Sequence, residues 1–155
     1  PKPKDVILDP FAGYGSIPLE RGRSFPYQKI FAVECDRPLF ERLKKRIKNK
    51  KTHVIYGDAL SLRDIPDGSI DKIITDPPWG IFQKTSLPPA DFYSKMLKEF
   101  LRVLSRNGVV VILIGQPEVF ESVLKEISGD WTLLAKHRIL VSGQKATLYK
   151  LRVIP

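Results

Sequence analysis

Short apolar runs alternate along this chain with longer segments whose apolar residues recur every three or four positions. The apolar runs, which predict strands, are residues 5–9, 30–33, 53–56, 70–75, 109–114, 133–141 and 145–153. The amphipathic segments, which predict helices, are residues 14–21, 38–47, 92–104 and 117–127. Such alternation is typical of an α/β protein with a parallel sheet. The last two runs flank Ser142-Gly143 and predict an antiparallel hairpin.

We therefore predict an α/β fold with an open sheet of about seven strands, mostly parallel, with a C-terminal antiparallel hairpin and helices on both faces. Residues 109–114 form the most apolar run and are expected to be a central strand. Asn107-Gly108 is expected to end the predicted helix of residues 92–104. The 155 residues fit one domain, which we assign to 1–155.

The composition excludes several classes of protein. No apolar run approaches the roughly 20 residues of a membrane span, so we expect no membrane partner. A single cysteine, Cys35, excludes a disulfide framework and a cysteine-cluster zinc site. The two histidines, His53 and His137, are far apart in sequence, and we expect no metal. The first four residues contain no apolar targeting segment, so we expect a cytoplasmic protein.

The charge of the chain favours a polyanionic partner. There are 26 basic and 17 acidic residues, which gives a net charge of +9. Residues 42–51 supply seven of the basic residues and no acid, so the rest of the chain carries only +2. This basic run is either a solvated helix face or a nucleic-acid contact. Lys84, Arg138 and Lys145 are expected near the acceptor site described below if their loop and hairpin fold over it.

A glycine-containing loop, residues 9–16, directly follows the first predicted strand. Gly13 and Gly15 allow a tight turn and a close approach of the backbone to a ligand. Open α/β sheets bind ligands at the carboxyl ends of their strands, where this loop lies. Pro18 and Leu19 stand where a dinucleotide-binding loop has its third glycine, which disfavours a pyrophosphate ligand.

Single carboxylates follow the next two predicted strands. Glu34, at the end of the second, is placed to accept hydrogen bonds from both hydroxyls of a ribose. Asp36 either shares that role or caps the helix that begins near Pro38. Cys35 is expected to lie against the ligand or the core as a small apolar residue rather than to act as a nucleophile. Asp58 follows the third strand, where it either accepts from an adenine amine or caps a turn.

The most specific motif directly follows the fourth predicted strand and reads Asp76-Pro77-Pro78-Trp79-Gly80. Prolines lack an N–H and fix the backbone, but their carbonyls remain acceptors. Asp76 and the Pro77 carbonyl can therefore both accept hydrogen bonds from one NH₂ group. Two such acceptors orient the lone pair of a weakly nucleophilic aryl amine toward an electrophile. The Trp79 ring offers a face on which a base can stack, a contact of about 1–3 kcal/mol.

In this order, each at a strand end, these motifs resemble those of the class I S-adenosylmethionine (SAM)-dependent methyltransferases. The Asp-Pro-Pro-Trp box is similar to that of enzymes that methylate exocyclic amines of bases. Most similar are the RNA guanine-N2 methyltransferases that carry an N-terminal THUMP domain. The resemblance rests on residues 9–16, 75–80, 92–115 and 138–149. It implies a Rossmann-like methyltransferase fold and a catalytic domain from the C-terminal part of a longer protein.

The resemblance also implies roles for individual residues. The glycine loop would hold the methionine part of SAM, Glu34 the ribose and Asp58 the adenine. The implied cofactor-binding residues are Asp9, Phe11, Gly13, Gly15, Glu34, Cys35, Asp58 and Ala59. The implied catalytic residues, which hold the acceptor base, are Asp76, Pro77, Pro78 and Trp79. The expected reaction moves a methyl group to N2 of a guanine flipped out of structured RNA, namely tRNA, and yields S-adenosylhomocysteine without a metal.

Other functions use similar residues. A DNA adenine-N6 methyltransferase has the same box but would add a DNA-reading domain. A protein glutamine methyltransferase usually has asparagine at the position of Asp76. A non-catalytic scaffold of the same fold would have lost one of the motifs. The permuted mRNA adenine methyltransferases carry their motifs in the reverse order, and a nicotinamide dehydrogenase would need the third glycine.

Overall fold

The computed structural model describes residues 1–79 and 87–154. The strands are β1 (Val6–Asp9), β2 (Lys29–Glu34), β3 (Thr52–Tyr56), β4 (Ile70–Thr75), β5 (Leu104–Ile114), β6 (Trp131–Val141) and β7 (Gln144–Val153). The helices are α1 (Ser16–Ser24), α2 (Arg37–Arg46), α3 (Pro89–Val103) and α4 (Pro117–Glu126). Every predicted strand and helix is therefore present. Along these residues no helix is both long and apolar enough to cross a membrane.

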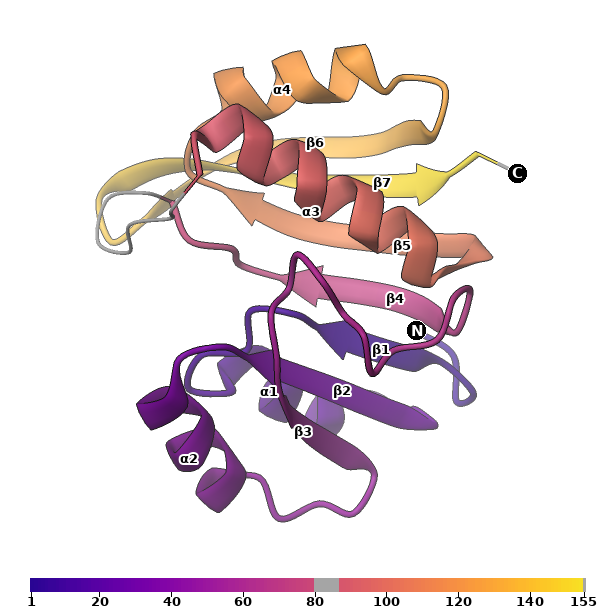
Figure 1. Cartoon of the computed structure of the whole chain (residues 1–155), viewed down its shortest axis with the longest axis vertical. Coiled ribbons are helices and arrows are strands. Elements are labelled where there is room, and N and C mark those ends of the chain that lie inside the picture. Colours follow the sequence, from indigo (N-terminus) through magenta and orange to yellow (C-terminus); the bar gives the residue numbers. More distant parts are fainter. Residues whose placement is uncertain (80–86, 155) are drawn as a thin grey trace.

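The strands form one seven-stranded sheet in the order β3-β2-β1-β4-β5-β7-β6. The first five of these pair in parallel, whereas β7 pairs antiparallel with both β5 and β6. This confirms the predicted fold. The direction of winding reverses between β1 and β4, because the chain leaves β1 toward β2 and β3 and then returns to β4 (Figure 1). The carboxyl ends of strands at such a reversal are the usual ligand site of an open α/β sheet.

Of the described helices, α3 and α4 cover one face of the sheet, and α1 and α2 cover the other. In Figure 1, α3 lies in front of the sheet and α1 behind it. In β1, Leu8 belongs to the large core under α3 and α4, whereas Ile7 points to the opposite face and packs with Tyr27. The other face also buries Leu43 of α2. The most apolar strand, β5, lies inside the sheet between β4 and β7.

The segment between β3 and β4 consists of turns, and α3 holds it against the sheet. Arg102 of α3 donates to the carbonyls of Leu62 (2.9 Å) and Ile65 (3.1 Å) and pairs with Asp67. Glu99, one turn earlier, accepts from the Leu62 N–H (2.6 Å) and from Arg102 (2.7 Å). The hydrogen bonds to Arg102 lower the pKa of Glu99. Glu99 and Arg102 together hold the segment that follows Asp58 in place.

The junction of α3 and β5 corrects one expectation. Asn107-Gly108 does not end the helix, because α3 stops at Val103 and β5 starts at Leu104. The register with β4 shifts there, so that residues 105–108 bulge from the ladder. A Cβ on Gly108 would lie 2.7 Å from the Leu104 side chain and 2.9 Å from the Ser105 carbonyl oxygen. The glycine thus permits a sharp bend inside the strand rather than a helix end.

We expect Arg102→Ala to lower the free energy of unfolding by about 2 kcal/mol, because it removes charge-assisted hydrogen bonds to two carbonyls and two carboxylates. Urea denaturation measures the change. Arg106→Ala, which removes an exposed arginine three residues past the helix, is the control. Equal stability of the two variants would contradict a structural role for Arg102.

Candidate active site

The glycine loop (residues 9–16) turns sharply at the carboxyl end of β1. Gly13 and Gly15 have φ angles of 50° and 83°, in the left-handed region that favours glycine. Because these residues stay in the loop, α1 begins at Ser16 instead of the predicted residue 14. A Cβ at Gly15 would lie 2.5 Å from the Leu43 side chain, whereas the space beside Gly13 is open. The loop therefore packs tightly on α2 and leaves room for a ligand at Gly13.

Asp9 is buried at the start of this loop, and one of its oxygens has no partner. Its Oδ1 accepts from the Thr75 hydroxyl (2.8 Å) and the Phe11 N–H (3.3 Å). Its Oδ2 is buried without a hydrogen bond from any described residue. Burial raises the pKa of Asp9 to about 7; the two hydrogen bonds oppose the rise, and the charges of Asp76 and Glu34 add to it. A cationic donor beside Oδ2 would satisfy this carboxylate.

Glu34, at the end of β2, joins the glycine loop to the start of α2. Its Oε2 accepts from the Gly13 N–H and its Oε1 from the Asp36 N–H, both at 2.8 Å. The side chain is buried, but each oxygen retains a second lone pair for a hydroxyl donor. The Asp36 side chain accepts from the Leu39 N–H at 2.9 Å, so Asp36 is the N-cap of α2, one of its two predicted alternatives.

Cys35 lies next to Glu34 and is exposed, so the alternative that placed it in the core is wrong. Partial burial of its sulfur raises the pKa of the Cys35 thiol, and the charges of Glu34 and Asp58 raise it further. A thiolate nucleophile is therefore disfavoured here, in agreement with the sequence. Contact of Cys35 with a ligand stays a prediction.

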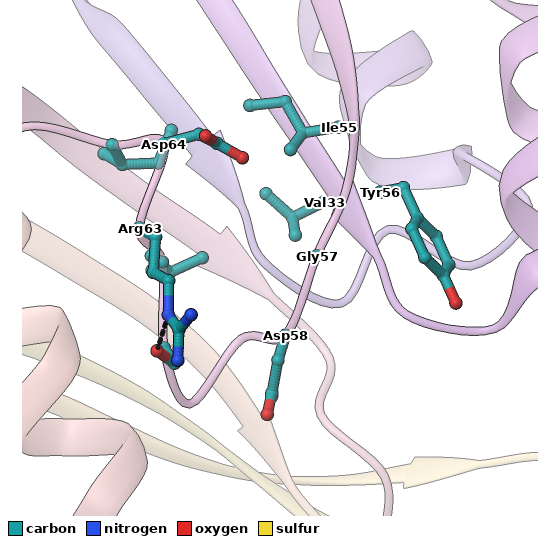
Figure 2. A pocket seen from close by; sticks show the side chains of 10 residues that line it. Val33, Ile55, Tyr56, Gly57, Asp58, Arg63 and Asp64 are labelled. Atoms are coloured by element: carbon teal, nitrogen blue, oxygen red, sulfur yellow. Dashed lines mark hydrogen bonds between the residues drawn. The ribbon is translucent and has the colours of Figure 1, made fainter.

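Asp58 stands at the rim of a cavity of about 300 Å³ beneath the segment between β3 and β4. Its Oδ1 accepts from the Leu60 N–H at 2.8 Å, the predicted turn cap, while Ala59 is buried. Figure 2 shows Val33 and Ile55 pointing into the cavity from the sheet, with Asp58 at one end. The cavity thus offers apolar side chains beside a carboxylate whose Oδ2 accepts no hydrogen bond from the described residues.

The acceptor box (residues 76–79) follows β4, next to Asp9. The indole N–H of Trp79 donates to Asp76 Oδ1 at 2.7 Å. Partial burial raises the pKa of Asp76, and the hydrogen bond from Trp79 opposes that rise. Pro77 is buried, and Pro78 and Trp79 are half-buried. Gly80, the last residue of the motif, and Lys84 lie outside the described residues.

Three residues that sequence reasoning did not single out position this box. Thr75, just before it, carries the hydroxyl that bonds to Asp9. Gln116 donates from Nε2 to the Trp79 carbonyl at 2.7 Å. A Cβ on Gly115 would lie 2.5 Å from Cγ and Cδ2 of Trp79, so the ring rests directly on the glycine backbone. A glycine directly after an apolar strand signals a close approach, and this signal could have identified Gly115.

The basic run 42–51 lies on α2 and the turn after it, on the β2–β3 side of the sheet, as expected. All seven of its basic side chains are exposed. Within residues 1–79 and 87–154, no three His, Cys, Asp or Glu side chains come close enough to hold a metal ion.

A sheet of parallel strands that ends in an antiparallel β7-β6 pair, with its ligand loops at the reversal, is the architecture of the class I SAM-dependent methyltransferases. The chain belongs to the family described as RMKL-like, methyltransferase domain (UPF0020), whose model matches residues 1–145. The crystal structure of TrmN from Thermus thermophilus has the same fold, with a TM-score of 0.83 and 22% identity over 98% of this chain and 45% of that one.

Two curated relatives act on tRNA. The tRNA (guanine(6)-N(2))-methyltransferase THUMP3 of Mus musculus is 26% identical over 98% of this chain and 33% of the relative. The tRNA (guanine(10)-N2)-dimethyltransferase of Methanothermobacter thermautotrophicus is 33% identical over 81% of this chain and 37% of the relative. The chain thus spans about a third of the length of these relatives.

We expect Gly115→Ala to lower methyl-transfer turnover by about tenfold or more, because the added methyl group would push the Trp79 ring out of position. Single-turnover kinetics measure the effect, and calorimetry with S-adenosylhomocysteine should give unchanged affinity. Gly129→Ala is the matched control, since its Cβ would meet nothing within 4 Å. Normal turnover of Gly115→Ala would show that the packing of Trp79 on Gly115 is not needed for methyl transfer.

Proposed function

We propose that this chain is the catalytic domain of a SAM-dependent RNA guanine-N2 methyltransferase that acts on tRNA in the cytoplasm. The observation that carries the proposal is the placement of the acceptor box beside the glycine loop, where Thr75 bonds to Asp9. The activities of the curated relatives support the choice of base and of RNA. Because these relatives are about three times as long, an RNA-binding domain in the same protein is part of the proposal.

The residues around the glycine loop fit SAM. The unpartnered Oδ2 of Asp9 would accept from the methionine ammonium group, and the open space at Gly13 would admit the methionine backbone. The remaining lone pairs of Glu34 would accept from the ribose hydroxyls. The free oxygen of Asp58 would accept from the adenine amine. When bound, SAM supplies an electrophilic methyl group.

The acceptor box would position the guanine. Asp76 Oδ2 and the Pro77 carbonyl would accept the two hydrogens of the exocyclic amine, while the Trp79 ring stacks on the base. This arrangement aims the nitrogen lone pair at the methyl group, so that the reaction depends chiefly on positioning. The amine loses a proton after transfer, and Asp76, with its raised pKa, is a better proton acceptor than an ordinary aspartate. Asp76 is therefore the side chain that we assign to this proton transfer.

Nucleoside mass spectrometry tests the proposal. The protein is incubated with SAM and, separately, unmethylated tRNA, ribosomal RNA or duplex DNA, with Asp76→Ala as the control. New N2-methylguanosine in tRNA that is absent with the variant is the expected result. Methyladenine in DNA would instead establish an adenine-N6 methyltransferase. If no product forms and calorimetry detects no binding of S-adenosylhomocysteine, the protein is a non-catalytic scaffold.

We expect Asp76→Asn to lower kcat by about 100-fold or more and to leave SAM affinity unchanged. The asparagine oxygen would keep the hydrogen bond from Trp79, and its NH₂ group would then face the NH₂ group of guanine. Rapid-quench methyl transfer and calorimetry separate the two effects, with Asp130→Asn as the control. Lost cofactor affinity would contradict the assignment of Asp76 to the acceptor site.

We expect Asp9→Asn to stabilise the free protein and to weaken SAM binding. The pKa of Asp9 is raised from 3.8 to about 7 in the folded protein. As the pH rises from 3.8 to about 7, the unfolded chain ionises first and the free energy of unfolding falls. Above about pH 7 the full loss of stability is present. Asparagine avoids this cost and should raise Tm at about pH 8, as thermal melts will show. Wild-type SAM affinity should rise from about pH 6 to about pH 8, because only the carboxylate pairs with an ammonium group. A pH dependence retained in Asp9→Asn would contradict this role.

A further inference from the structure

The β6–β7 hairpin extends beyond the rest of the sheet at the edge that carries the site. Ile114, the last residue of β5, pairs with Thr147, which also pairs with Arg138. Three more residue pairs of the hairpin follow before the turn, from Ile139↔Ala146 to Val141↔Gln144. At about 3.3 Å per residue, the hairpin projects roughly 10 Å past β5. Figure 1 shows its turn on the same side as the arrowheads of β1, β4 and β5.

This projection lies beside the acceptor box. The Trp79 ring rests on Gly115, which directly follows Ile114. The hairpin therefore leaves the sheet at the level where Trp79 packs. Ser142 and Gly143 both have positive φ angles, 50° and 81°, as in the tight two-residue turns that match the twist of a hairpin. The tip is thus held in one geometry by its own ladder and turn.

Three side chains at the tip share one face. On β7, Tyr149 packs against α4, so Lys145, four residues before it, points to the same side of the sheet. Arg138 and Leu140 stand opposite Thr147 and Lys145 and take the same direction. All three are exposed, and Leu140 is 70% exposed. Arg138 and Lys145 form no ion pair with a carboxylate of any described residue. An apolar side chain is therefore flanked by two free cations.

The whole β6–β7 hairpin is rich in basic residues. Residues 131–153 contain five lysines and arginines and no acid. Without this hairpin and the basic run 42–51, the chain holds 14 basic and 17 acidic residues. The positive charge is thus concentrated in two segments that flank the site from opposite ends of the sheet. In the run 42–51, Arg42 and Arg46 already bond to Tyr14 of the glycine loop, whereas the cations at the hairpin tip are free.

We propose that the tip of the β6–β7 hairpin is an RNA-binding surface, in which Arg138 and Lys145 contact phosphates next to the target nucleotide and Leu140 packs against a neighbouring base or ribose. The inference rests on the proposed function and names the part of the site that recognises its substrate. Phosphate contacts release counterions and are therefore salt-dependent, whereas an apolar contact is not. The two kinds of contact can thus be separated by experiment.

The test measures binding of an unmodified tRNA transcript by fluorescence anisotropy at several salt concentrations. Arg138→Ala/Lys145→Ala should weaken binding about tenfold and reduce the salt slope by about 1.5. Lys150→Ala/Arg152→Ala is the matched control, because it removes the same charges from exposed positions at the other end of β7. Leu140→Ser should weaken binding without a change in slope. All variants should keep the wild-type Tm and affinity for S-adenosylhomocysteine.

Two results would overturn this inference without touching the proposed function. One is an equal loss of tRNA affinity in both double variants, which would indicate an effect of overall charge. The other is wild-type affinity of Arg138→Ala/Lys145→Ala for the transcript. In either case, N2-methylguanosine formed by the wild type would leave the proposed function intact. A wild-type protein that does not bind the transcript would overturn this inference alone. One that neither forms N2-methylguanosine nor binds S-adenosylhomocysteine would overturn the proposed function, and this inference with it.

Discussion

The hydrogen bond from Thr75 to Asp9 joins the two halves of the site. It connects residues 66 positions apart, at the carboxyl ends of β1 and β4, the two strands between which the sheet reverses its winding. The glycine loop begins at one end of this bond, and the acceptor box begins directly after the other. Because the bond is buried, the spacing between the proposed cofactor site and the proposed acceptor site depends on a contact that water does not weaken. The same burial leaves Asp9 with an oxygen that the described residues do not satisfy.

Much of the fold and the location of the site could be predicted from local signals. Alternation of apolar and amphipathic segments identified the strands and helices, and glycines and prolines marked the loops at their ends. The carboxyl ends of parallel strands lie at one edge of a sheet. The motifs that follow the first four strands could therefore be expected to lie close together. Asp36 as a helix cap belongs to the same local class, since the cap and its partner are three residues apart.

The contacts that position the site could not be predicted in this way. The bonds of Glu34 to Gly13 and of Gln116 to Trp79, and the seat of Trp79 on Gly115, depend on how distant strand ends align. That alignment follows from the packing of the whole sheet. The bulge at residues 105–108 is a second example, because tertiary pairing with β4 overrode a local Asn-Gly signal. Exposure of Cys35 likewise depends on what surrounds it and not on its neighbours in sequence.

The position of β6 at the margin of the sheet has a consequence for solubility. Among the described strands it pairs only with β7, so one side of an 11-residue strand presents unpaired backbone groups to solvent. Long open strands of this kind are templates for pairing with another chain. Two charged side chains, Lys136 and Arg138, interrupt the apolar residues of β6 near its middle, and charged residues on an edge strand disfavour pairing with a second chain. The basic side chains of this strand therefore protect the isolated protein from edge-to-edge association.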